Sequence, residues 1–352
     1  MGINFFNPVV ESIKFHMNFL QMLEDQQDEI RDLFNKWAEG LVDRDGKLVK
    51  EFQTTFNSTF WEVYLYAILK EGGLKCDFTI ARPDFIIKNS GYEFCIEAVV
   101  SNAARGDRPE WHKDTFKEGW KPPRKNNVDY ASLNRYAMIR HSNAIQSKYE
   151  LYKKKYCCLD HAKGKPFVIA LGAYDNPNSW EEMNRAIMAV LYDYYIDEQD
   201  AFAGEVLHYS PFPVKTLGKV KKDNGSDVCL GLFNSPKMKE ISAVIFSCTA
   251  TMGKLRALVS KKSGFNIFSY HWMTPGGQIG YNSLVGDECL GDGLMVFHNP
   301  FAEIPLLQDP LEIPGVSHYY FDIEGKNDYV IATDGPMLMA RANIHLNVTK
   351  DK

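Results

Sequence analysis

Two acidic residues, Asp84 and Glu97, stand in apolar segments that the sequence predicts to be neighbouring strands, RPDFIIK (82–88) and YEFCIEAVV (92–100). A carboxylate at the end of a buried strand costs several kcal/mol unless it is paired, hydrogen-bonded or bound to a metal. Two converging carboxylates also repel each other unless a cation lies between them. The intervening NSG (89–91) is typical of a tight turn, so the strands can form a hairpin that brings the acids together. The pair therefore predicts oxygen ligands for a hard divalent ion, Mg²⁺ or alternatively Mn²⁺.

Each acid also has an interpretation that needs no metal. A Pro-Asp pair such as Pro83-Asp84 commonly opens a turn or caps a helix. Glu97 could instead form a salt bridge with Arg82 or Lys88. The two acids alone leave these alternatives open, so the elements that position them have to be considered.

Helix and strand patterns follow one another in a definite order. Residues 1–50 have apolar residues at three- and four-residue spacing, which predicts an N-terminal helical hairpin that DRDGK (43–47) interrupts. A further helix ends at Gly72-Gly73. Three strand-like segments (75–81, 83–88 and 92–100), a charged loop (103–132), a long helix (133–156) and a buried strand (164–175) complete the series. The predicted order is αβββαβ, and the fold class is α/β.

From about residue 51 to 175, this order resembles the PD-(D/E)xK nuclease superfamily, which has the restriction-endonuclease-like fold. The matching residues are Pro83-Asp84 at the start of the second strand, Glu97 near the end of the third, and Glu62 in the helix FNSTFWEVYLYAILKEGG. A looser similarity to a group of bacterial proteins extends to HNPFAEIPL (298–306). The resemblance implies a nuclease core with a mixed central sheet at 51–175. A helical segment at 1–50 would precede it, and an α/β extension at 176–352 would pack on it.

The resemblance also implies a chemistry, the metal-dependent hydrolysis of phosphodiester bonds, with DNA as the expected substrate. Asp84, one oxygen of Glu97 and the backbone carbonyl of Val99 would hold Mg²⁺. Glu62 would bind a metal-bound water or help a second ion, although it could equally be an acid on the helix surface. Superfamily members that cut both strands often dimerise, so a homodimer is a family-level expectation.

One departure from the superfamily motif concerns catalysis directly. The motif has an acid, any residue and then lysine, whereas here Glu97-Ala98 is followed by Val99. The missing ammonium would orient the attacking water and offset charge on the phosphate. Lys148, in the following helix near its apolar stripe, is the candidate replacement, since Glu97 would give it a partner. The alternative is a surface lysine whose stem covers apolar area.

The charge distribution bears on the partner. The net charge of −5 argues against a protein that coats nucleic acid, but the segment 105–155 is strongly basic and contains stackable rings. Its members are Arg105, Arg108, Lys113, Lys117, Lys121, Arg124, Lys125, Arg135, Arg140, Lys148, Lys153, Lys154 and Lys155, with Trp111, Trp120, Tyr130 and Tyr136. A solvated loop followed by an amphipathic helix has the same pattern.

Other features bound the environment of the protein. No apolar run approaches 18 residues and the N-terminus lacks a signal-peptide pattern, so we expect a cytoplasmic protein with no membrane segment. The seven cysteines lack metal-ligand spacing. We expect reduced thiols, buried in the strand-like segments that contain Cys76, Cys95, Cys229 and Cys248.

The half of the chain after residue 175 is less informative. It predicts a helix at 179–195 and strands at 241–250 and 293–300, which would extend the same sheet. The glycine-rich stretch 276–293 and the surroundings of His298 are expected to be loops.

Two other functions stay open beside the nuclease. The first is a catalytically inactive nucleic-acid-binding or regulatory module that keeps the fold and has lost chemistry with the lysine. The second is a toxin or phage-defence effector that acts only with a partner protein.

Overall fold

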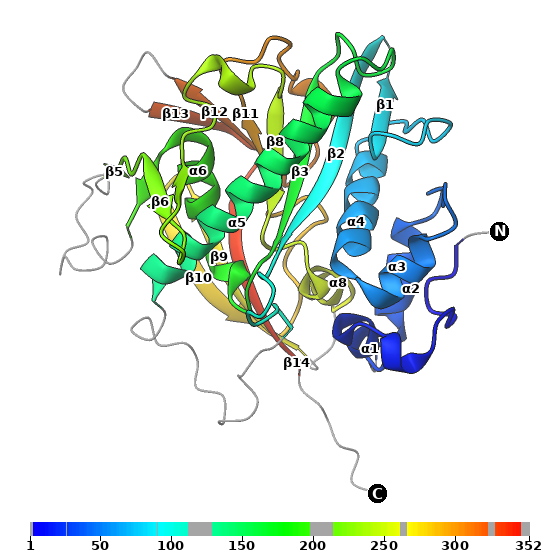
Figure 1. Ribbon diagram of the computed structural model, residues 1–352. Coiled ribbons are helices and arrows are strands. Elements are labelled where there is room, and N and C mark those ends of the chain that lie inside the picture. The colour runs from blue at the N-terminus through cyan, green and yellow to red at the C-terminus, as the bar shows by residue number, and fades with distance from the viewer. Residues whose placement is uncertain are drawn as a thin grey trace, which may run out of the picture.

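A seven-stranded mixed sheet forms the centre of the protein. The computed structural model describes residues 3–25, 27–89, 91–111, 129–197, 214–260, 266–322 and 328–345. The strand order is β1-β2-β3-β8-β11-β12-β13 (Figure 1). These strands are β1 (Phe85–Asn89), β2 (Tyr92–Asn102), β3 (Phe167–Tyr174), β8 (Ala243–Ser247), β11 (Met295–His298), β12 (Ser317–Asp322) and β13 (Asp328–Ala332). The α/β class is thus confirmed, and the two strands predicted at 241–250 and 293–300 extend the same sheet as expected.

Alternate residues of the central strands enter two separate cores, one on each face. Ile87, Ile96 and Ala170 belong to one core, and Ile86 and Ile169 belong to the other. Because side chains alternate across a strand, such burial on both sides requires helices on both faces. The strand β3 is buried at all of its positions, which explains its unbroken apolar sequence.

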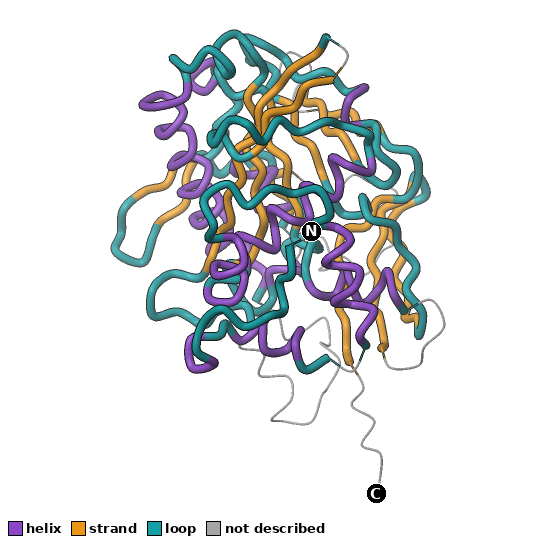
Figure 2. The backbone as a smooth tube through the Cα atoms, turned by 90° about the vertical axis from the view of Figure 1, so that its right-hand side faces the viewer, coloured by secondary structure: helices purple, strands orange, loops and turns teal. Residues whose placement is uncertain are grey.

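The N-terminal helices cover the first face. They are α1 (Met17–Leu23), α2 (Asp28–Trp37), α3 (Leu48–Thr54) and α4 (Asn57–Glu71), joined by α8 (Met252–Val259). A short 3₁₀ turn, η1 (Ser12–Lys14), precedes them. The core here is rich in aromatic rings, including Phe34, Phe52 and Phe60, which stack on one another. Figure 2 views the molecule from the side of these N-terminal helices.

Two other helices cover the second face. The long α5 (Tyr130–Leu151) crosses in front of β2 and β3 in Figure 1 and packs against both strands. It continues into a π-helical turn, η3 (Tyr152–Tyr156), closed by a hydrogen bond of 3.0 Å from the amide of Cys157 to the carbonyl of Tyr152. The shorter α6 (Arg185–Tyr192) packs beside α5.

Smaller elements complete the chain. A second sheet has the order β10-β9-β14, with β9 (Asn266–Thr274), β10 (Gly277–Ser283) and β14 (Met337–His345). Two ribbons pair β4 (Tyr195–Ile196) with β5 (Val214–Lys215), and β6 (Lys219–Lys221) with β7 (Asp227–Cys229). Further 3₁₀ turns are η4 (Ser179–Glu181), η5 (Pro236–Met238) and η6 (Asp309–Leu311). None of the helices described is both long and apolar enough to cross a membrane.

Several predicted elements need correction. The segment 75–81 is not a strand, because apart from one bridge between Cys76 and Ile87 it turns away, with the side chain of Asp77 accepting from the amide of Thr79. The helix predicted at 179–195 is interrupted, since Met183 has a positive φ of 53° between η4 and α6. The stretch 276–293 contains β10 rather than loops alone.

Two single residues also differ from expectation. His298 is the last residue of β11 and is buried, not part of a loop. Cys229 is exposed, because its strand belongs to a two-stranded ribbon and not to the main sheet. All seven cysteines are free thiols, as expected.

Candidate active site at the edge of β1 and β2

The hairpin of β1 and β2 aligns the two predicted acids. The strands pair antiparallel from Asn89 opposite Tyr92 to Phe85 opposite Ile96. Continuing that register by one residue places Asp84 opposite Glu97. Both acids have the strand parity of Ile86, which lies in the core under α5. The carboxylates therefore belong to the face that α5 covers.

Asp84 directly precedes β1, at the point beyond which β2 has no β1 residue to pair with. One of its oxygens, Oδ2, accepts a hydrogen bond of 2.8 Å from the backbone amide of Ala98. This bond satisfies a β2 amide that has no β1 residue to pair with. The side chain is half-buried, and its other oxygen, Oδ1, makes no hydrogen bond within the described residues, so it can bind a further ligand.

Glu97 is buried in β2 and is held by α5. Its Oε1 accepts a hydrogen bond of 2.7 Å from Lys148 Nζ and a longer one of 3.4 Å from the hydroxyl of Tyr156. Its Oε2 is buried and has no hydrogen-bond partner in the described part of the chain. The predicted contact between Lys148 and Glu97 is present. The alternative pairing of Glu97 with Lys88 is not, because Lys88 binds Asp77 at 2.7 Å.

Lys148 comes from the last turn of α5, about one turn before the π-helical segment. Its side chain is 23% exposed, compared with 4% for that of Glu97. The ammonium therefore sits between the buried acid and solvent, where a substrate group could reach it. Tyr156 follows on η3, and its ring contacts Phe167 of β3 with centroids 6.0 Å apart.

Glu62 reaches the same region from α4, which packs against β2. Burial, and then the negative charge of Asp84, raises the pKa of Glu62 to about 8. Among the nearby cations, Arg44 and Lys148 act against this shift. A carboxyl of this kind is not an ordinary acid on a helix surface, and its electrostatic partner is the acid at the start of β1.

The other two acids respond to the same surroundings. Burial raises the pKa of Asp84, while Lys148 and the amide of Ala98 oppose the shift. Burial followed by the charge of Asp84 raises the pKa of Glu97, again opposed by Lys148. The charge of Asp84 thus raises the pKa of both Glu62 and Glu97, and a cation beside these acids would stabilise their ionised forms.

The backbone ligand requires a correction. The amide of Cys95 donates to Pro166 at the β3 side, and the amide of Ala98 donates to Asp84 at the β1 side. Because successive residues of a strand direct their polar groups to opposite edges, the carbonyl of Val99 faces β3. The carbonyl of Ala98, not that of Val99, lies on the edge occupied by Asp84.

A divalent ion fits these residues in part. The orphaned Glu97 Oε2 and the free Oδ1 of Asp84 offer hard oxygen donors, and Mg²⁺ needs only one or two carboxylates because it keeps several waters. The three acids do not form a closed three-ligand cage. Within the described residues, the only such group with ligand atoms close together is His141, Asp175 and Glu182, elsewhere on α5 and beyond β3.

The basic segment gives a mixed result. Trp120 and the basic residues Lys113, Lys117, Lys121, Arg124 and Lys125 lie outside the described residues. At the far end of β2, Arg140 on α5 donates to the carbonyl of Asn102 at 2.8 Å. Farther along, Arg135 pairs with Asp223 at 3.0 Å, and Tyr136 donates to Asp107 at 2.7 Å. Several members thus have partners within the protein.

Sequence reasoning missed two residues of the cluster. Tyr156 was hidden by the π-helical turn, which changes the helical phase that places side chains. Arg44, whose charge opposes the raised pKa of Asp84 and Glu62, lies in the DRDGK segment. It donates to the carbonyl of Ile80 at 2.9 Å. An exposed-loop arginine before two helices has no sequence signal that points to a strand edge.

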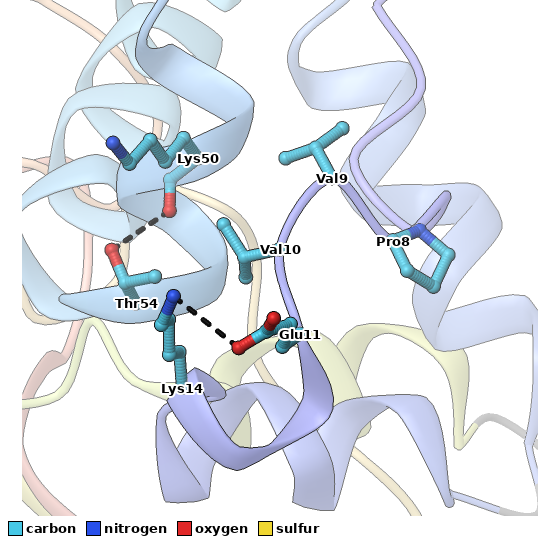
Figure 3. Close-up of a pocket in the computed structure, with 7 residues that line it drawn as sticks. All are labelled: Pro8, Val9, Val10, Glu11, Lys14, Lys50 and Thr54. Carbon is cyan, nitrogen blue, oxygen red and sulfur yellow. Dashed lines mark hydrogen bonds and ion pairs between the residues drawn. The ribbon is translucent and has the colours of Figure 1, made fainter.

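A hollow on the described structure lies away from this site. It is a groove of about 780 Å³ between the N-terminal segment and α3, lined by Pro8, Val9, Val10, Glu11, Lys14, Lys50 and Thr54 (Figure 3). Two of its three charged side chains form an ion pair, Lys14 with Glu11 at 3.4 Å. The groove lacks a cluster of titratable groups, so it does not compete with the acids as a catalytic site.

Comparisons with known proteins add no assignment. No family model matches this sequence, and neither a curated protein nor a solved structure matches the chain. The candidate site therefore depends on its own geometry.

Proposed function

We propose that the protein is a Mg²⁺-dependent nuclease that hydrolyses phosphodiester bonds, with Asp84, Glu97, Lys148 and Glu62 as its active site. The observation that carries the proposal is the 2.7 Å contact between Lys148 Nζ and Glu97 Oε1. This contact brings a lysine to Glu97, whose own strand, β2, contains none. DNA is the proposed substrate, and a role in restriction or phage defence is the proposed setting.

Each residue would have a distinct task. Asp84 Oδ1, Glu97 Oε2 and the carbonyl of Ala98 would hold the ion. The bound ion would supply Lewis acidity toward a water and offset charge on the phosphate. Lys148 would donate to the attacking water or to a phosphate oxygen and so keep the two in line. Glu62 would accept a proton or a hydrogen bond from a metal-bound water, a task suited to a carboxyl whose pKa is about 8.

Plasmid cleavage tests the proposal. The wild type should cut supercoiled or single-stranded DNA only with Mg²⁺ or Mn²⁺, and Asp84→Ala and Lys148→Ala should each lose on the order of 100-fold or more in rate. Lys153→Ala is the matched control, because Lys153 lies in the next turns and pairs with Glu150 at 2.5 Å. If the wild type cuts neither DNA nor RNA with any divalent metal, the enzyme proposal fails.

A second candidate is an inactive nucleic-acid-binding or regulatory module. The observation that favours it is the direct ion pair between Lys148 and Glu97, which occupies one ligand oxygen and neutralises the acid without a metal. This module would bind DNA equally well in EDTA and after Asp84→Ala. Filter-binding or fluorescence-anisotropy measurements on the same variants separate the two candidates.

A further inference from the structure

A second group of metal-ligand side chains lies at the middle of α5. His141 comes from α5, Asp175 directly follows β3, and Glu182 lies between η4 and α6. All three side chains are fully buried. One ligand atom from each residue lies within 4.8 Å of the other two. Three elements distant in sequence thus direct two carboxyl groups and an imidazole into one interior point.

The contacts within the group leave ligand capacity unused. His141 Nε2 lies 2.9 Å from Glu182 Oε2. Asn176 Nδ2 donates to Asp175 Oδ2 at 2.8 Å and to Glu182 Oε1 at 3.2 Å. Asp175 Oδ1 is buried without a hydrogen-bond partner among the described residues.

Charge within the group is also unbalanced. Across the described ranges, no lysine or arginine forms an ion pair with Asp175 or Glu182. Arg185 directs its guanidinium to the backbone carbonyls of Glu181 and Glu182 and to the sulfur of Met183, and its charge also acts on the Glu182 carboxyl. Two buried carboxylates beside a neutral imidazole require a cation or a shared proton to be tolerated.

We propose that His141, Asp175 and Glu182 bind a divalent transition-metal ion, with Zn²⁺ as the best match, at a structural site separate from the acids of β1 and β2. One imidazole nitrogen with two carboxylate oxygens is a ligand set that suits Zn²⁺, whereas Mg²⁺ selects oxygen ligands alone. Asp175 Oδ1 and His141 Nδ1 are both buried without a hydrogen-bond partner among the described residues, so each could serve as a ligand atom.

An ion at this location would help to fix the position of α5. His141 and Lys148 are seven residues apart on one helix, which corresponds to about 10 Å along its axis. An ion at this group would tie α5 to the end of β3 and to the segment before α6. The same helix would then present Lys148 to Glu97 from a fixed position.

Zn²⁺ binding by the full-length chain is the test, measured by calorimetry and by metal analysis after dialysis. The background is Asp84→Asn with Glu97→Gln, which removes the acids of the proposed nuclease site. We expect one equivalent of Zn²⁺ in this background and a rise in melting temperature on its addition. Adding Asp175→Asn and Glu182→Gln should weaken the affinity by about 100-fold or more. Glu181→Gln, a change at a buried acid beside the group, should leave it unchanged.

Two artefacts are controlled in this comparison: Zn²⁺ binding by other side chains and loss of the fold. The seven cysteines and the paired His298 and His318 are the same in every protein tested, so a difference in binding reports the three ligands. His141→Gln provides a second variant, which should lose binding while the fold is retained by circular dichroism. If the background protein binds no Zn²⁺, or if the ligand variants bind it equally well, the group is a proton-sharing cluster and the proposal is overturned. Because no nuclease activity is read, this result stands or fails independently of the proposed function.

Discussion

The hydroxyl of Tyr156 donates a hydrogen bond of 3.4 Å to Glu97 Oε1, the same oxygen that accepts a hydrogen bond of 2.7 Å from Lys148 Nζ. The two donors therefore hold Oε1 and leave Oε2 as the oxygen available to a ligand. The hydrogen bonds to Oε1 orient the carboxylate, and Oε2 can still bind a metal ion.

Replacing Tyr156 by Phe should weaken that orientation and leave the lysine in place. We expect Tyr156→Phe to reduce Mg²⁺-dependent cleavage by roughly 3- to 10-fold, because one long hydrogen bond of 3.4 Å contributes about 1 kcal/mol. Tyr152→Phe is the control, since Tyr152 packs on the same Phe167 ring without a bond to Glu97. Equal rates for Tyr156→Phe and the wild type would show that the hydroxyl does not orient the carboxylate.

Glu62→Gln should stabilise the metal-free protein and damage the enzyme. Burial and the charge of Asp84 raise the pKa of Glu62 to about 8, above its unfolded value. Ionisation therefore lowers the stability progressively as the pH rises from about 4.5 to 8, and glutamine removes this loss. We expect a higher melting temperature than that of the wild type at pH 8, with little difference at pH 4.5.

The cleavage rate of Glu62→Gln should fall by about 10-fold or more, since the proposed proton acceptor is gone. Glu71→Gln, at the exposed end of the same helix, should alter neither quantity. A variant that is less stable than the wild type at both pH values would contradict the electrostatic account of Glu62.

A buried histidine pair predicts sensitivity to acid. His298 Nε2 lies 2.9 Å from His318 Nδ1, and burial, followed by the charge of His318, lowers the pKa of His298 to about 3. The unfolded chain takes up this proton near pH 6.5, so the contribution to stability is complete above that value and is lost as the pH falls toward 3. Each histidine contributes a slope of at most about 1.4 kcal/mol per pH unit.

Urea unfolding at pH 7 and pH 5 measures this loss. The wild type should lose free energy of unfolding between the two values, and His298→Gln should show a smaller decrease. An unchanged slope in His298→Gln would indicate that other groups cause the sensitivity to acid.

The C-terminal half contains a buried ionic cluster whose loss should unfold the protein. Glu288 accepts from Arg341 Nη1 at 2.8 and 2.9 Å and also pairs with Lys254, and all three side chains are buried. Glu288→Gln would leave two buried cations without their counter-ion, at a cost of about 3–5 kcal/mol. Denaturant unfolding measures it, with the exposed Glu303→Gln as a control that should change stability by less than about 1 kcal/mol. A loss no larger than that of the control would mean that the cluster is not a stability determinant.

Much of the site followed from local patterns. The acids of β1 and β2 were visible because charge is costly in apolar strands, and Lys148 was visible because α5 keeps a regular helical period up to that residue. The π-helical turn ends this period, so the position of Tyr156 could not be obtained from spacing.

Other features depend on pairing between distant segments, which a single sequence does not encode locally. His141 looks like one more residue of an amphipathic helix until Asp175 and Glu182 are brought beside it. The segment 75–81 has strand-like composition, but the turn at Asp77 prevents a ladder. In the second half, only β8 and β11 were predicted, whereas the other strands and the alternation of parallel and antiparallel pairing from β8 to β13 were not.

The position of β8 limits how the protein can be dissected. Residues Val168–Gly172 of β3 pair in parallel with Ala243–Ser247. A chain shortened to end near residue 175 would keep every proposed catalytic residue, yet it would expose an entirely apolar strand as an open edge. Such edges recruit other chains, so the shortened protein should aggregate instead of acting as a minimal nuclease. Any regulation through the C-terminal half must then work without detaching it.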